Sequence, residues 1–361
     1  MTKNIKNINI KSICATLFIS LFLSCNNSGE SAEAEQRLNT VLMDVGRSAE
    51  DAFYSFIDLI SDTLGLRVTA GTTKNKIGEY FSGLGEKLGK AADQLEEVAV
   101  KAVADVDTDG LLNKAIKEAV DTAKGVLDTL KGHLESLKDI GDANQKVGET
   151  ENTSSSAKEG KAADDAALKK VYKALKGIVD IAITDGSIKA LESGSITLQA
   201  TNSKDGAKIL ATDQSHKPGA AVGDKAAVIL SKVSGAEMLA SIVNSKEEDP
   251  QLTKNATGET TAMSFARGNK GGDYLAQDDA KAAAVAGGIA LRSLVKTSTL
   301  AANNSGDDKT VQASGVTAVN KLLGAVEDII KKAVKNILKA VKEKIDQART
   351  SKISVSELGQ Q

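Results

Sequence analysis

Apolar residues recur at intervals of three and four through most of the 361-residue chain. The pattern is strongest in residues 315–350, where lysines occupy the remaining positions and crowd toward the C-terminal end. Such spacing places apolar side chains on one face of an α-helix and charged side chains on the opposite face. The sequence therefore predicts long amphipathic helices over residues 31–64, 75–104, 111–140, 166–183, 224–243, 277–300 and 315–350.

The composition also favours helices. Aromatic residues make up 3% of the chain, tryptophan is absent, and Pro218 and Pro250 are the two prolines. Alanine, leucine, lysine and glutamate, which have high helix propensity, are abundant. We therefore predict a mainly α fold, an elongated helical bundle with long loops and a few short strands. Its best-filled core is expected near the early aromatic residues Phe53, Tyr54, Phe56, Tyr80 and Phe81.

Four segments lack the helical spacing and are rich in glycine, serine and charged residues: 141–165, 187–223, 245–261 and 301–315. This composition is typical of exposed loops, in which a substitution typically changes the free energy of unfolding by less than about 0.5 kcal/mol. Within the second segment, the alternating sequence SITLQA (195–200) is the best candidate for a short strand. The tail ISVSELGQQ (353–361) does not follow the helical spacing.

The first 24 residues have the three parts of a secretory signal peptide. Lys3, Lys6 and Lys11 precede an apolar run that ends at Leu23, and the small residue Ser24 follows. The run is about 11 residues long, which is too short to cross about 30 Å of hydrocarbon. The segment is therefore predicted to be a signal peptide that is cleaved between Ser24 and Cys25, and not a membrane anchor.

Cys25 directly follows the apolar run and resembles the lipobox cysteine of bacterial lipoproteins, in the loose form found in spirochaetes. The usual pattern has leucine three residues before the cysteine and alanine or serine two before it, where this chain has Phe22 and Leu23. The alternative is an ordinary signal peptide with a chance cysteine. The resemblance implies a diacylglyceryl thioether and an amide-linked acyl chain on Cys25, and this lipid would attach the mature chain to a membrane.

Removal of residues 1–24 takes away three lysines and no acidic residue, so the formal net charge changes from −2 to −5. This charge is mild and spread along the chain, and it indicates no nucleic-acid partner. With Cys14 lost in the signal peptide and Cys25 acylated, no thiol remains for a disulfide. Residues 25–361 are therefore predicted to form a single helical domain that is stabilised by packing.

One segment resembles a calcium-binding loop between two helices. In DVDTDGLLNKAI, Asp105, Asp107, Asp109 and Gly110 match loop positions 1, 3, 5 and 6. Position 12, which needs a bidentate glutamate, is Ile116. We therefore favour a solvated turn in which Asp109 caps the following helix, and we expect no metal site.

Other candidate sites have little support. GLGEKLG (83–89) lacks the spacing and the preceding strand of a phosphate-binding loop, and its glycines are better explained by close helix contact. His133 and His216 are the two histidines, and they show no spacing typical of a zinc site or a Ser-His-Asp triad. We therefore expect no enzymatic activity, no catalytic residue and no cofactor.

Four segments together resemble the variable large proteins of relapsing-fever Borrelia, which belong to the variable major lipoprotein family and are related to the Vls surface lipoprotein of Lyme-disease Borrelia. They are the start LFLSCNN, the segment ETTAMSFARG, the segment DDAKAAAVAGGIALRSLVK and the terminal helix-forming stretch GVTAVNKLLGAVEDIIKKAVKNILKAVKEKID. The resemblance covers nearly the whole chain. The third segment is similar to one that family members keep unchanged, and its residues of interest are Asp278, Asp279, Ala284, Ile289, Leu291, Arg292, Leu294 and Val295.

The resemblance implies a helical fold whose N- and C-terminal helices pair next to the membrane, with variable loops at the distal end. It also implies a surface-exposed lipoprotein of the outer membrane that serves antigenic variation, with one gene expressed at a time and switching that escapes host antibodies. The expected partners are outer-membrane lipid and antibodies. A weak homodimer remains open as the oligomeric state.

An adhesin is the alternative function, with a host glycosaminoglycan or matrix protein as its ligand. The lysines Lys331, Lys332, Lys335 and Lys339 favour it, although such lysines commonly form the solvated face of an amphipathic helix.

Overall fold

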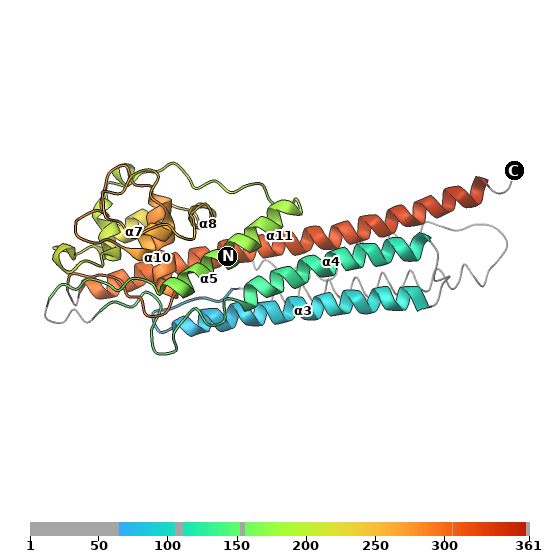
Figure 1. Cartoon of the computed structure of the whole chain (residues 1–361), viewed down its shortest axis with the longest axis horizontal. Coiled ribbons are helices and arrows are strands. Elements are labelled where there is room, and N and C mark those ends of the chain that lie inside the picture. Colours follow the sequence, from blue (N-terminus) through green and yellow to red (C-terminus); the bar gives the residue numbers. More distant parts are fainter. Residues whose placement is uncertain (1–64, 105–110, 152–155, 305, 359–361) are drawn as a thin grey trace, which may run out of the picture.

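The computed structural model describes residues 65–104, 111–151, 156–304 and 306–358 (Figure 1). Three long helices run side by side along the molecule: α3 (Lys74–Ala104), α4 (Leu111–Glu135) and α11 (Asp307–Leu358). α4 packs against both α3 and α11, and α5 (Asp165–Thr184) packs against α4 and α11. These four helices are termed the stalk.

Shorter helices gather around the N-terminal part of α11, at one end of the molecule (Figure 1). α7, α8 and α10 contact α11 directly, and α9 packs against α10. These elements and the segments that join them are termed the head. They are α6 (Leu198–Thr201), the 3-10 helices η1 (Lys204–Leu210) and η2 (Gln214–His216), α7 (Gly223–Ser231), α8 (Gly235–Val243), α9 (Ala262–Arg267) and α10 (Ala282–Leu294).

The apolar stripes found in the sequence form the core of the stalk. Leu84 and Leu88 of α3, Leu127 of α4, and Val326 and Ile330 of α11 are all at most 1% exposed. Burying one such side chain contributes about 1.5–3 kcal/mol relative to leaving it in water, so each stripe is a strong determinant of helix packing. The predicted mainly α fold is confirmed.

The ends of two long helices differ from prediction. α4 ends at Glu135, before the predicted residue 140, yet Leu137 and Ile140 remain fully buried in the turns that follow. α11 begins at Asp307, inside the segment predicted to be a loop, and extends through most of the tail to Leu358. The side-chain oxygen of Asn304 accepts the backbone N–H groups of Gly306 and Asp307 at 3.0 and 3.1 Å and so starts α11 early.

The helix predicted over residues 224–243 is two helices, α7 and α8, which meet at 96°. Ser234 and Glu237 form a capping box that starts α8, with Ser234 Oγ accepting the Glu237 N–H at 3.2 Å. Among the described residues, no single helix is long and apolar enough to cross a membrane. The bent α7–α8 pair reaches this length and apolar character when its two helices are taken together, by length and composition alone.

The strand predicted at 195–200 is wrong. Thr197 instead caps the short helix α6, with its side chain accepting the Ala200 N–H at 3.5 Å, because a threonine oxygen satisfies a free N–H of the first turn. Thr197 also makes one antiparallel bridge with Lys281. Within the described ranges, extended pairing occurs as isolated bridges of this kind.

The segments predicted to be loops are not uniformly exposed. Ile209 and Leu210 in the second segment, Leu252 in the third and Ala302 in the fourth are at most 6% exposed, and Val147 in the first is fully buried. Irregular backbone can place single apolar residues in the core without producing any periodic spacing. Contrary to the prediction from the sequence, substitution is therefore not free along the whole of these segments. A small effect on stability is expected at their exposed positions alone.

Several sequence predictions lie outside the described residues. They are the helix over 31–64, the aromatic residues Phe53, Tyr54 and Phe56, and the signal-peptide and lipidation residues Ser24 and Cys25. Tyr80 and Phe81 lie in α3 with their ring centroids 5.6 Å apart.

Candidate functional site

α10 is the centre of the head, and all of its residues are buried. The structure places most of the segment singled out in the sequence in or next to this helix: Ala284, Ile289, Leu291, Arg292, Leu294 and Val295 are at most 5% exposed. Asp278 and Asp279 precede α10 and are exposed, and Asp278 forms an ion pair with Lys204 at 3.0 Å. The segment is therefore a buried helix with an acidic, accessible entrance.

Two glycines let α10 approach its neighbours closely. A Cβ atom on Gly287 would lie 2.7 Å from Ser241 Oγ of α8, and one on Gly288 would lie 2.5 Å from Phe265 Cβ of α9. Real Cβ atoms essentially never come closer than 3.0 Å to other heavy atoms, so a side chain at either position would force the helices apart.

We expect Gly288→Ala to lower the free energy of unfolding by about 1–3 kcal/mol, because the added methyl group overpacks the contact between α10 and α9. Urea unfolding followed by far-UV circular dichroism measures the change. Gly125→Ala is the matched control, since nothing lies within 4 Å of its added Cβ in α4. The control should be neutral or stabilising by up to about 1 kcal/mol, as expected for replacing glycine in a helix.

Arg292 is a fully buried cation near the end of α10. Its Nε donates to the Ala266 carbonyl at 2.9 Å, and its Nη2 donates to the carbonyls of Leu210 at 3.1 Å and Phe265 at 3.4 Å. These carbonyls end α9 and η1, where the helix dipoles are negative. Burial lowers the pKa of the guanidinium to about 9. Arg292 therefore joins α10, α9 and η1 through one side chain.

Lys74 joins the head to the stalk in the same way. It lies in the first turn of α3, is fully buried, and its Nζ donates to the Val295 carbonyl at 2.7 Å and to the Ser298 carbonyl at 2.6 Å. Ser298 Oγ lies 3.0 Å from the same nitrogen. Burial lowers the pKa of this lysine to about 7, against the smaller opposing effect of Glu149.

We expect the Lys74→Met variant to lose a pH dependence of stability that the wild type shows. Because the folded pKa is below the unfolded value, the unfolded chain binds more protons between about pH 7 and 10.5. Wild-type stability should therefore fall as the pH drops from about 10.5 to 7, by at most about 1.4 kcal/mol per pH unit. Urea unfolding at a series of pH values across this range measures the pH dependence of stability, with the exposed Lys76→Met as control. Equal slopes for wild type and Lys74→Met would contradict the prediction.

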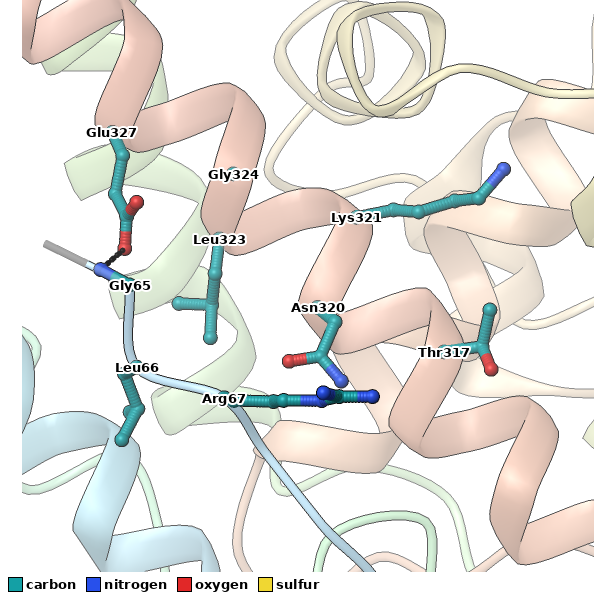
Figure 2. A pocket seen from close by; sticks show the side chains of 9 residues that line it. All are labelled: Gly65, Leu66, Arg67, Thr317, Asn320, Lys321, Leu323, Gly324 and Glu327. Atoms are coloured by element: carbon teal, nitrogen blue, oxygen red, sulfur yellow. Dashed lines mark hydrogen bonds between the residues drawn. The ribbon is translucent and has the colours of Figure 1, made fainter. Parts of the chain in front are cut away.

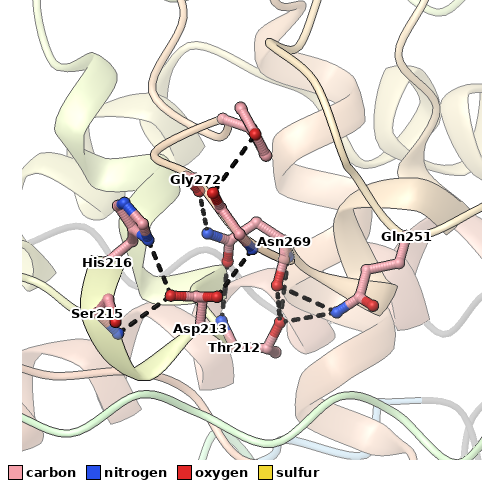
Figure 3. Close-up of polar contacts among 9 residues, drawn as sticks. Thr212, Asp213, Ser215, His216, Gln251, Asn269 and Gly272 are labelled. Carbon is pink, nitrogen blue, oxygen red and sulfur yellow. Dashed lines mark hydrogen bonds and ion pairs between the residues drawn. The ribbon is translucent and has the colours of Figure 1, made fainter.

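A polar network holds the head segments around residues 212 and 269 together (Figure 3). Thr212 N–H donates to Asn269 Oδ1 at 2.9 Å, and Gln251 Nε2 donates to Thr212 Oγ1 at 3.1 Å. Asp213 accepts the Gly271 N–H at 2.8 Å and lies 2.8 Å from His216 Nδ1. The Gly271 N–H first, and then His216, hold the pKa of the Asp213 carboxyl below its usual range.

This arrangement does not have the geometry of a Ser-His-Asp triad. Ser215, the neighbouring serine, donates its backbone N–H to Asp213 at 3.0 Å, and the contact drawn in Figure 3 therefore does not involve its hydroxyl. The network ties loops to one another, which is a structural role.

A groove of about 450 Å³ lies between residues 65–67 and α11 (Figure 2). Asn320 holds the segment beside it, because its side chain accepts the Val68 N–H at 2.9 Å and donates to the Val68 carbonyl at 3.0 Å. Glu327 accepts the Gly65 N–H at 3.2 Å and the hydroxyl of Tyr80. The described chain thus begins fixed against the middle of α11.

The remaining candidate residues have structural explanations. His133 lies in α4, and its ring packs against Gly177 of α5, where a Cβ would lie 2.3 Å from it. A Cβ atom added to Gly85 or Gly89 of GLGEKLG would lie 3.0–3.1 Å from Lys131 of α4, which confirms that these two glycines permit close helix contact. Gly83 has nothing within 4 Å of such an atom, so the prediction is wrong for this residue. Residues 105–110 of the calcium-like sequence lie outside the described residues. Among those described, no three His, Cys, Asp or Glu residues are grouped to hold a metal.

Comparison with known proteins relates the chain to proteins of Borrelia. Variable large protein 25 of Borrelia hermsii is 54% identical over 96% of each chain, and variable large protein 7 is 50% identical over 98% of this chain and 97% of its own. The crystal structure of the Lyme disease variable surface antigen VlsE of Borrelia burgdorferi has the same fold, with a TM-score of 0.68 and 23% identity over 88% of this chain and all of that one. Residues 49–345 match the Borrelia lipoprotein family, and the chain therefore belongs to this family.

Proposed function

We propose that this protein is a lipid-anchored antigen of the Borrelia outer surface and that it serves antigenic variation. The observation that carries the proposal is its 50–54% identity to variable large proteins over nearly its whole length. Expression of one family gene at a time, with switching that escapes antibody, is part of the proposal. The family relation also supports a role without catalysis.

The direction of α11 and the family resemblance support one position for the lipid. The Gly65 N–H bonds to Glu327 in the middle of α11, and α11 extends from there to Leu358, away from the head (Figure 1). The family resemblance implies that the N- and C-terminal helices pair next to the membrane, which would place the lipid on Cys25 at the end of the stalk opposite the head. The head would then be held away from the membrane, where antibodies reach it.

The head combines a fixed interior with replaceable surface positions. α10, Arg292 and the glycines beside them have close contacts on every side. Lys189 and Lys254 lie in irregular segments, Gln214 lies in η2, and all three are exposed. Substitutions at exposed positions typically change stability by less than about 0.5 kcal/mol. The surface can therefore change in sequence while the fold is kept, as antigenic variation requires.

Absorption of immune serum with intact bacteria tests this division. Antibodies against peptides from 187–223 and 245–261 should be removed by intact cells, because these segments have exposed positions in the head. Antibodies against the peptide 277–296 should largely remain, because its helix is buried. Equal removal of both would contradict the proposal, and resistance of the protein to protease on intact cells would contradict the surface location.

An adhesin is the second candidate, favoured by the lysines of α11. Lys332, Lys335 and Lys339 are exposed, whereas Lys331 is half-buried and lies 3.8 Å from Asp328. Binding to heparin that is sensitive to salt and is lost in Lys331→Glu with Lys335→Glu would support this function.

A further inference from the structure

We propose that the stalks of neighbouring copies of this chain pack side by side, with a basic strip on α11 of one copy against an acidic strip on α3 of the next. The inference rests on the proposed function, because attachment by one end would hold the copies parallel. The contact between copies would form between two sets of exposed charged side chains, which lie on opposite sides of the stalk in a single copy.

The basic strip consists of Lys332, Lys335 and Lys339. The spacing of three and four places these residues on one face of α11. That face is opposite the buried stripe that contains Ile330 and Ile337. Lys339 lies 3.5 Å from Glu343, but its side chain remains 70% exposed and accessible to a neighbour. The strip therefore points away from the core of its own copy.

The acidic strip consists of Glu79, Glu86 and Asp93, which are all exposed. A spacing of seven residues returns to nearly the same face of a helix after two turns. This face of α3 is opposite the buried Leu84 and Leu88. Lys90 lies on the same face, and Lys76 lies 3.7 Å from Glu79, so both lysines reduce the net charge of the strip. The strip nevertheless stays negative and complements the lysines of α11 in sign.

The two strips also lie at the same level of the stalk. The hydroxyl of Tyr80 donates to Glu327, and α3 and α11 run in the same direction (Figure 1). At 1.5 Å per residue, Glu86 lies about 9 Å beyond Tyr80, and Lys332 lies about 8 Å beyond Glu327. Asp93 and Lys339 lie about 20 and 18 Å beyond the same two residues. Copies that stand parallel without a vertical shift therefore bring Glu86 to the level of Lys332 and Asp93 to the level of Lys339.

The strips cannot neutralise each other within one copy. α4 packs against both α3 and α11, so these two helices lie at different edges of the stalk (Figure 1). A copy thus offers its basic strip to one neighbour and its acidic strip to another. Such a head-to-tail contact does not close on itself as a two-fold dimer does, so it extends copies into rows.

The contact should be weak in solution and effective on a surface. An exposed ion pair contributes about 0.2–1 kcal/mol, and salt screens it over a Debye length of about 8 Å at physiological ionic strength. Tethering raises the effective concentration of one copy around another to the millimolar range, about where contacts of this strength begin to be populated. The expected product is a salt-sensitive surface array, with little association of the free chain.

Fluorescence energy transfer between tethered copies tests the proposal. The mature chain, with a histidine tag in place of Cys25, is bound to zwitterionic vesicles that carry a nickel-chelating lipid. Donor- and acceptor-labelled copies should transfer energy above the level of random mixing at about 50 mM salt and lose the excess at about 500 mM. Because the tag replaces the lipid, the result does not depend on whether Cys25 is acylated in the cell, which palmitate labelling tests separately.

Charge reversal gives the decisive comparison. Lys332→Glu with Lys335→Glu and Lys339→Glu should abolish the excess transfer, and so should Glu79→Lys with Glu86→Lys and Asp93→Lys. An equal mixture of the two variants should restore it, because the first is acidic on both strips and the second is basic on both. Lys189→Glu with Lys232→Glu and Lys254→Glu, on exposed lysines of the head, is the matched control and should keep the excess transfer.

The outcomes separate this contact from other uses of the lysines. Excess transfer that survives either reversal, or a mixture that fails to restore it, would overturn the proposal. Binding of the untagged chain to phosphatidylglycerol vesicles or heparin, lost in the lysine variant while the mixture stays inactive, would assign the basic strip to another polyanion. Circular dichroism spectra that match the wild type establish that each variant is folded.

Discussion

Arg292→Ala is expected to lower the free energy of unfolding by about 3–5 kcal/mol. The substitution removes hydrogen bonds to the carbonyls of Ala266, Leu210 and Phe265, which have no access to water in its place. It also leaves a cavity where a fully buried side chain was. Relief of the desolvation that lowers the pKa of the guanidinium offsets part of the loss.

Arg292→Lys separates the role of the charge from that of the planar group. Lysine keeps a cation but lacks the fork that reaches α9 and η1 together, so we expect an intermediate loss. Arg67→Ala is the matched control, because Arg67 is exposed beside the groove, and it should change stability by less than about 0.5 kcal/mol. Urea unfolding measures all three. If Arg292→Ala unfolded at the same urea concentration as the wild type, the buried guanidinium would not hold the head together.

Helical spacing predicted the four helices of the stalk and the ends of α3 and α5, but not the end of α4 or the ends of α11. α3 and α5 differ from the predicted ranges by a residue at their ends, because each carries one apolar stripe that packs against long neighbours. Helical spacing predicted the helix ends less well in the head, because α10 is buried on all sides and has no polar face that marks its ends. It was predicted over 277–300 and occupies Ala282–Leu294.

The break between α7 and α8 had a sequence signal that the apolar spacing concealed. Ser234 followed by Glu237 is the pattern of a capping box, and it starts a new helix inside an apparently continuous stripe. The buried positions of the irregular segments had no comparable signal. Ile209 and Leu210 reach the core through a 3-10 helix whose position depends on contacts with α7.

The burial of Lys74 and Arg292 could not be predicted from the sequence. Lysine and arginine are almost always exposed, and neither residue has a local carboxylate pattern that suggests pairing. Their partners are backbone carbonyls at helix ends that lie far away in sequence, with Val295 and Ser298 more than 200 residues from Lys74. Any residue supplies a backbone carbonyl, so such a site leaves no mark on residue identity.

Cys25→Ala is expected to abolish attachment of the protein to the outer membrane. One acyl chain contributes about 0.8 kcal/mol per buried methylene and alone binds reversibly, whereas several chains on one residue hold it stably. The apolar run of the predicted signal peptide, about 11 residues long, is too short to replace them. Labelled palmitate should enter the wild-type protein and not the variant, which should stay unprocessed or become soluble.

Cys14→Ala is the matched control for this prediction. Cys14 lies within the apolar run that the predicted cleavage would remove, so its loss should leave both the palmitate label and membrane attachment unchanged. Label in Cys25→Ala would show that another residue carries the lipid. If the wild-type protein lost residues 1–24 but carried no palmitate label, these residues would be an ordinary signal peptide. The proposed anchor at the end of the stalk would then be wrong, because Cys25 is the residue that places the membrane there.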